Sequence, residues 1–153
     1  MTTEHPIAVL LPLLSGALTF LCTTLVHAFP LRATVNFIRR ETSLGRVGAS
    51  FCIDMGIVAR TITYAMAAHL IEIGLWAVLF IVCREFQGFG IAYYHSAVNY
   101  TTLGYGDIVM TPPWRLLGPL EAANGMLMFG VSTAMIFAVI LKLVETRFAD
   151  LRE

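Results

Sequence analysis

One short stretch of the chain, residues 101–107, could do chemistry with its backbone rather than with its side chains. It reads Thr-Thr-Leu-Gly-Tyr-Gly-Asp, so glycine alternates with larger residues. Glycine adopts left-handed backbone conformations that other residues reach only at a cost. Such an alternation can turn successive carbonyls to one side, and four of these ladders around an axis would surround a bare cation with oxygens. The hydroxyl of Thr102 would add one more oxygen at the inner end.

The composition of the chain indicates where this stretch is held. Of the 153 residues, 58% are hydrophobic and only 13% are charged, which is typical of a membrane protein of one domain. The formal net charge is zero and no basic run is present, so nothing suggests binding to nucleic acid. Cys22, Cys52 and Cys83 are scattered and odd in number, and we interpret them as small buried hydrophobic residues.

The first predicted span covers residues 7–29, which is long enough to cross the hydrocarbon core of a bilayer. A cleaved signal peptide is the alternative, but residues 1–6 contain no Lys or Arg and the apolar run exceeds a signal core. We therefore expect a retained helix. Residues 30–50 hold four arginines against one acid, Glu41, and we expect a cytoplasmic loop there by the positive-inside rule.

The second predicted span, residues 57–83, contains His69 and Glu72 one helical turn apart and therefore on the same face. Ionisable groups at this depth are costly unless they pair or face protein or water. Two interpretations are open. The pair could form a local hydrogen bond that faces a neighbouring helix, or it could sense protons or support a pore.

Residues 91–101 are too few to cross a bilayer, since a helix of this length is about 17 Å long. They suit a re-entrant helix whose carboxyl end presents the negative end of its dipole to a cation. After Pro112 and Pro113, which interrupt helix formation, the third span is predicted over residues 116–144. Glu121 near its start could lie at the outer mouth of the pore loop or could be a first-turn acid favoured by the helix N-terminus.

The third span carries a stripe of residues at three- and four-residue spacing, which places them on one helical face: Met126, Phe129, Thr133 and Phe137. The hydroxyls of Ser132 and Thr133 favour a wet cavity on this face, and the stripe is a candidate gate. Gly125 and Gly130 could bend the helix or let neighbouring helices pack closely, and both interpretations are open.

Residues 101–107 resemble the selectivity-filter signature of tetrameric pore-loop potassium channels, and the resemblance covers about residues 57–145. It implies potassium as the bound and transported ion, with a set of five filter residues as ligands: Thr102, Leu103, Gly104, Tyr105 and Gly106. Leu103 departs from the family's usual Val or Ile, but its carbonyl rather than its side chain would face the ion.

The resemblance also implies residues that support the filter, namely Tyr94, Thr101 and Asp107. In the family, an aromatic residue at the position of Tyr94 forms a hydrogen bond with the acid at the position of Asp107. Some relatives carry a carboxylate in the middle of the pore helix, behind the filter, where this chain has Val98. That departure leaves the stability of the filter to be explained by other residues.

Taken together, these observations predict an all-α membrane protein with three transmembrane helices, a re-entrant pore helix and a selectivity filter. Residues 1–50 would form an extra helix with an Arg-rich loop, and residues 51–153 the pore domain. One filter segment and no internal repeat are present, so we expect a homotetramer around a central pore. The N-terminus would lie outside and the C-terminus in the cytoplasm, in the plasma (cell inner) membrane.

The expected function is passive, potassium-selective conduction across the lipid bilayer, without catalysis and without an organic cofactor. Three other functions stay open. The chain could be a non-conducting auxiliary subunit, a subunit of a coupled potassium transporter, or a weakly selective cation channel. Relatives of the last kind usually lose the tyrosine at the position of Tyr105.

Overall fold

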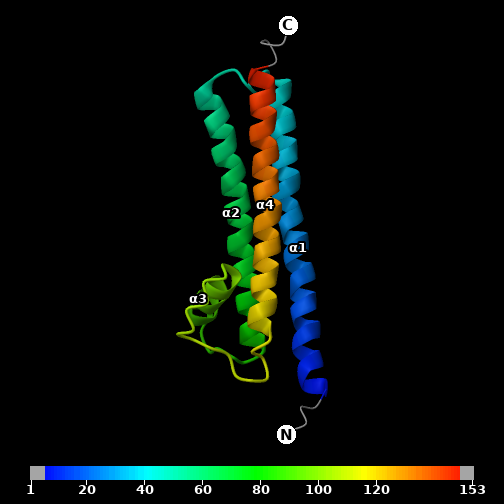
Figure 1. The fold of residues 1–153 in the computed structure, drawn as a ribbon, viewed down its shortest axis with the longest axis vertical. Coiled ribbons are helices and arrows are strands. Elements are labelled where there is room, and N and C mark those ends of the chain that lie inside the picture. The colour runs from blue at the N-terminus through cyan, green and yellow to red at the C-terminus, as the bar shows by residue number, and fades with distance from the viewer. Residues whose placement is uncertain (1–5, 149–153) are drawn as a thin grey trace. The chain divides into compact units, whose positions relative to one another are not determined.

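The computed structural model of the chain describes residues 6–148, and within them it contains four helices and no strand (Figure 1). The helices are α1 (Pro6–Ser43), α2 (Phe51–Val82), α3 (Phe89–Tyr100) and α4 (Leu117–Arg147). Three of them, α1, α2 and α4, are long and apolar enough to cross a membrane. The predicted all-α fold with three spans is therefore confirmed. The interpretation of the three cysteines as buried is wrong, because Cys22 and Cys52 lie on exposed helix faces and Cys83 is half-buried.

The first helix is longer than predicted. It continues through Pro30 to Ser43, so the prediction of a loop over residues 30–50 is wrong for most of that range. Proline is tolerated inside membrane helices because neighbouring groups satisfy the backbone group that it frees. Gly45, with φ of 64°, ends the helix because its amide donates to the carbonyl of Thr42 at 3.0 Å. The next amide, of Arg46, donates to Glu41 at 3.0 Å and completes the capping motif.

The two faces of α1 differ in a way that suits a bilayer. Small and polar residues are buried, among them Gly16, Thr23 and Thr34. Leucines lie on the opposite face, and Leu18 and Leu25 are 64% and 67% exposed. Helices in membranes associate through small residues and hydroxyl groups, since lipid tails are as apolar as leucine. The pattern therefore presents leucine to lipid and the small residues to the protein.

The chain divides into two compact units. The first unit comprises residues 1–26 and 70–128, and the second unit comprises residues 27–69 and 129–153. In the first unit, α3 packs on α2 and α4 around a core that includes Trp76, Phe80, Tyr100 and Leu117, all without exposed surface. In the second unit, the core consists of Val47, Ile57, Val139 and Leu143.

The ends of α2 and α4 in the second unit are joined by a carboxylate, that of Asp54. It accepts a hydrogen bond from the amide of Gly48 at 2.9 Å and contacts the guanidinium of Arg147 at 3.4 Å. A further arginine, Arg60, stacks on the ring of Phe37 at 4.4 Å and donates to the hydroxyl of Tyr64. Cationic groups thus gather in this unit, as the sequence predicts.

Candidate functional site

The candidate site begins where α3 ends. The amide of Thr102 donates to the carbonyl of Asn99 at 2.8 Å, and the amide of Leu103 donates to that of Val98 at 3.0 Å. These two bonds, together with the left-handed conformation of Thr102, form the common capping motif at the C-terminus of a helix. The first residues of the 101–107 stretch therefore serve also as the cap of the short helix that precedes them.

The backbone of residues 101–107 alternates between two conformations. Thr102, Gly104 and Gly106 have φ values of 62°, 58° and 72°, whereas Leu103 and Tyr105 between them are not in the left-handed region. The left-handed conformations predicted for the two glycines are thus present. Thr102 shares them although it is β-branched, and such residues rarely have positive φ. Carbonyls along a backbone that alternates in this way can face one side.

The same stretch is exposed along its whole length in the single chain. Leu103 and Tyr105 are 58% and 67% exposed, and nothing lies within 4 Å of a Cβ placed on Gly104. Non-helical backbone is tolerated at membrane depth only where protein or a water-filled cavity covers it. The stretch therefore requires cover from outside the chain if it lies within a bilayer.

A side chain of α3 contacts the far end of this stretch. The hydroxyl of Tyr94 donates to Oδ2 of Asp107 at 2.7 Å, which is the contact that the resemblance implies. This hydrogen bond raises the pKa of Tyr94. The neighbouring His95 is buried against the rings of Phe80 and Phe86, with centroid distances of 5.4 and 4.9 Å. Burial lowers the pKa of His95.

Sequence reasoning did not single out His95, which packs α3 against two phenylalanine rings. Its ring contacts the side chain of Asn99, one turn further along α3, at 2.9 Å. The histidine follows Tyr94 directly and lies four residues before Asn99, so its place on α3 could be read from the sequence. Its aromatic neighbours could not, because they come from a different helix and from the loop after it.

Glu121 lies behind α3 and has no exposed surface. The hydroxyl of Ser96 lies 2.5 Å from its Oε1 and 2.8 Å from the carbonyl oxygen of Ile73 in α2, within hydrogen-bond distance of both. The interpretation of Glu121 as a first-turn acid is wrong, because it is the fifth residue of α4, beyond the first turn. Its place relative to the outer mouth of the pore loop stays a prediction. Packing of α4 against α3 places the carboxylate in the protein interior instead.

A second carboxylate supports α3 from the other side. The buried hydroxyl of Tyr100 donates to Oε2 of Glu72, and neither residue has any exposed surface. The pore helix itself has only the buried Val98 where some relatives carry an acid. The buried carboxylates that contact α3 therefore come from the two neighbouring helices, Glu72 in α2 and Glu121 in α4.

The two glycines of the predicted hinge differ in their surroundings. A Cβ on Gly125 would lie 2.0 Å from the carbonyl oxygen of Tyr100, whereas nothing lies within 4 Å of one on Gly130. Both residues lie inside one uninterrupted helix, α4. Gly125 therefore permits close packing of α4 and α3. Next to Gly125, the side-chain amide of Asn124 donates to the hydroxyl of Thr23 at 2.8 Å. This hydrogen bond joins α1 to α4.

The predicted cavity stripe lies on the exposed face of α4 in the single chain: Met126, Phe129, Thr133 and Phe137. Phe137 is 65% exposed. Phe129 differs from the other three because its ring packs on His69 of α2, at a centroid distance of 4.4 Å. The sequence did not indicate this contact, since the two residues are far apart along the chain.

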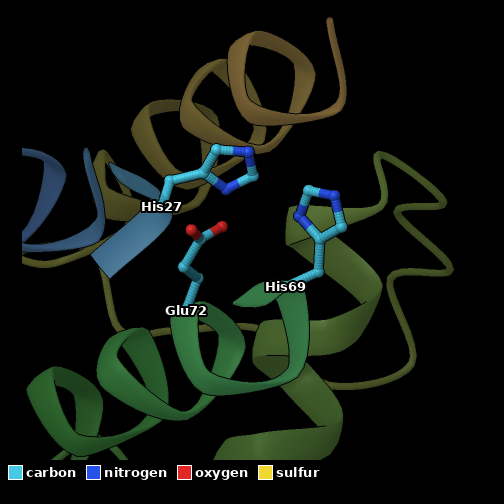
Figure 2. Close-up of side chains that lie close together, drawn as sticks. All are labelled: His27, His69 and Glu72. Atoms are coloured by element: carbon cyan, nitrogen blue, oxygen red, sulfur yellow. The ribbon is translucent and has the colours of Figure 1, made fainter. Parts of the chain in front are cut away.

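The second unit contains a buried pair of histidines, His27 of α1 and His69 of α2, which Figure 2 shows in close-up. The hydroxyl of Ser132 in α4 lies 3.0 Å from Nε2 of His27 and 3.1 Å from Nε2 of His69. Glu72, the third side chain drawn, lies one turn beyond His69 along α2 and belongs to the first unit. Sequence reasoning singled out His69 and missed its partner from α1.

Comparison with known proteins gives one finding. No curated protein and no solved structure matches the chain. Residues 68–142 match the family described as "Ion channel". This range contains α3, residues 101–107 and most of α4, and the match supports a pore-loop ion channel family and a channel function for the chain.

Proposed function

We propose that the chain is a potassium-selective channel that conducts passively through a ring of four identical 101–107 stretches. The observation that carries this proposal is the alternation of φ at Thr102, Gly104 and Gly106. In four copies, the carbonyls of such a backbone, with the hydroxyl of Thr102, would replace the water around a dehydrated potassium ion. Oxygen from backbone and hydroxyl groups is the ligand type that a hard monovalent cation prefers.

The assembly in this proposal is a homotetramer. Each chain has a single 101–107 stretch, and the exposure of that stretch in the single chain supports the presence of neighbours that cover it. The helix α3 would direct its carboxyl end at the ion path and add a favourable dipole there. The exposed stripe of α4, with Phe137 as its most exposed aromatic residue, would line the pore.

The orientation follows from charge. Arg39, Arg40 and Arg46 follow the apolar part of α1, so we place this end of the helix in the cytoplasm and the N-terminus outside, in a plasma (cell inner) membrane. A Ser43→Cys variant, with the native cysteines replaced by serine, tests the orientation. An impermeant thiol reagent should label it only from the cytoplasmic side, and labelling in intact cells would reverse the orientation.

Flux measurements with purified protein in liposomes test the proposed function. The parent should carry potassium at least tenfold faster than sodium, and Gly104→Ala should lose this preference. A Cβ at φ of 58° costs about 1–2 kcal/mol and disturbs the carbonyl alignment. Gly90→Ala is the matched control, since nothing lies within 4 Å of its Cβ and its φ is ordinary.

Two of the alternative functions predict a different result in the same liposomes. A non-conducting subunit would give no flux from the parent. A weakly selective cation channel would give equal potassium and sodium flux. If Gly104→Ala conducts with the selectivity of the parent, residues 101–107 are not the filter.

A further inference from the structure

The histidine pair of the second unit has no part in the proposed ion path. His27 and His69 are only 2% and 5% exposed. Their rings lie 5.2 Å apart, centroid to centroid, at an angle of 43°. Both Nε2 atoms approach one point, the hydroxyl of Ser132. Three different helices thus bring two imidazoles and a hydroxyl together.

The chemistry of this pair is that of a transition-metal ligand set. Neutral imidazole is the commonest protein ligand for such metals, whereas calcium and magnesium prefer oxygen. The ligand nitrogens of His27 and His69 lie within 4.8 Å of each other. Two imidazole nitrogens on one tetrahedral zinc ion, each about 2.0–2.1 Å from the metal, are about 3.3 Å apart. A shift of each nitrogen by less than about 1 Å would close the difference.

The neighbours of the two rings restrict how the rings can turn. The ring of Phe129 packs on His69 at 4.4 Å with an angle of 38°, which restricts rotation of that imidazole. Ser132 lies within hydrogen-bond distance of both rings and comes from the same helix as Phe129. Residues that orient the ligands contribute to metal affinity almost as much as the ligands themselves.

A small crevice of the second unit reaches one side of the pair, where His27 and Ser132 line it. The surface that the crevice exposes is apolar, although Thr34 and Thr61 are among its lining residues. A metal site requires both an access path and room for the ligands that the protein does not supply. The crevice has room for about one water molecule, which would add one ligand.

We propose that His27 and His69 bind a divalent transition-metal ion of the zinc class, with Ser132 beside the metal and a water molecule as a further ligand. Because the two histidines belong to α1 and α2, the bound ion would link these helices directly. The competing possibility is that the rings and Ser132 form only a hydrogen-bonded contact between helices.

Cobalt binding to the full chain tests the proposal. The protein is purified without a histidine tag, its cysteines are alkylated, and Co²⁺ is followed by its visible absorption, with Zn²⁺ as competitor. We expect one ion per chain, displaced by zinc, with at least tenfold weaker binding in His27→Gln and in His69→Gln. Ser132→Ala should weaken binding severalfold. His95→Gln, which removes a histidine of the first unit, should bind as the parent does.

A second measurement needs no variant and therefore covers the case in which a substitution prevents folding. The melting temperature of the parent is measured with and without Zn²⁺, and Ca²⁺, which prefers oxygen ligands, is the control ion. Zinc should raise the melting temperature, because an ion that binds only the folded state stabilises it, and calcium should not. Absence of binding by the parent, binding in both histidine variants as tight as in the parent, or an unchanged melting temperature with zinc would each overturn the proposal.

Discussion

The carbonyl oxygen of Tyr100 occupies the space where a side chain on Gly125 would begin. A Cβ at that position would lie only 2.0 Å from the oxygen and 2.9 Å from the carbonyl carbon. Backbone therefore meets backbone at the point where α4 crosses the end of α3. Since Tyr100 immediately precedes the 101–107 stretch, the position of that stretch depends on the absence of one methyl group.

Replacement of this glycine should be damaging for that reason. We expect Gly125→Ala to lower the melting temperature of the protein in detergent and to abolish selective potassium flux, because backbone atoms cannot rotate away as a side chain can. Gly130→Ala is the matched control in the same helix, with nothing within 4 Å of its Cβ. It should be neutral or stabilising by up to about 1 kcal/mol, since alanine favours helix over glycine. Equal melting temperatures for the two variants would contradict the close contact.

The buried bond between Glu121 and Ser96 leads to a prediction about stability. Glu121→Ala should destabilise the fold by about 1–3 kcal/mol, the usual effect of removing a buried hydrogen-bond partner. Glu121→Gln retains an acceptor oxygen for Ser96 and should have a smaller effect. Denaturant unfolding in micelles provides the measurement, and the exposed Glu145→Ala in the same helix is the control. A loss from Glu145→Ala as large as that from Glu121→Ala would show that the bond does not contribute.

Burial of His95 gives the protein an acid-sensitive contact. Burial is the main cause that lowers its pKa, and it outweighs the opposing effects of the Ile108 backbone and the charges of Asp107 and Glu85. Below the usual value of 6.5, the unfolded chain therefore takes up a proton while the folded chain stays neutral, and stability falls as the pH falls. We expect His95→Gln to reduce the loss of melting temperature between pH 7 and pH 5. An unchanged pH profile would exclude His95 as its source.

The exposed ring of Phe137 is the candidate constriction of the pore, in which four rings would stop ions by dewetting. We expect Phe137→Ala to raise the open probability in single-channel recordings without a change in selectivity. Phe137→Asp should attract cations and raise conductance further. Val131, which is exposed on another face of α4, provides the control substitution Val131→Ala. If both Phe137 variants gate as the parent does, the constriction lies elsewhere and gating at residues 101–107 is preferred.

The sequence predicted the helices well wherever hydrophobic length decided the outcome. The bounds of α3 and α4 lie within three residues of their predicted bounds, whereas α2 begins six residues before its predicted start, at Phe51. The end of α1 was misjudged at Pro30, because proline and the arginines after it are typical of a loop in water. In the structure the helix continues to the capping glycine, Gly45, which was the better signal for its end.

Only those features of the site that involve residues close together in the sequence could be predicted. The left-handed glycines and the contact of Tyr94 with Asp107 involve residues that are close along the chain or part of one motif. The partners of Glu121 and of His69 come from other helices, and no periodic pattern connects residues that are far apart in sequence. Those contacts depend on how the helices are aligned along one another, which hydrophobic periodicity does not specify.

Thr102 stands in a conformation that its own side chain opposes. A left-handed conformation costs a non-glycine residue about 1–2 kcal/mol, and glycine would remove that cost together with the hydroxyl. In the proposed tetramer the cost arises four times, so the total is about 4–8 kcal/mol. That amount is comparable with the whole stability of a typical domain, which is about 5–15 kcal/mol. The threonine that supplies the proposed hydroxyl ligand would thus lower the stability of the assembly. A Thr102→Gly channel would be more stable and would conduct potassium less well.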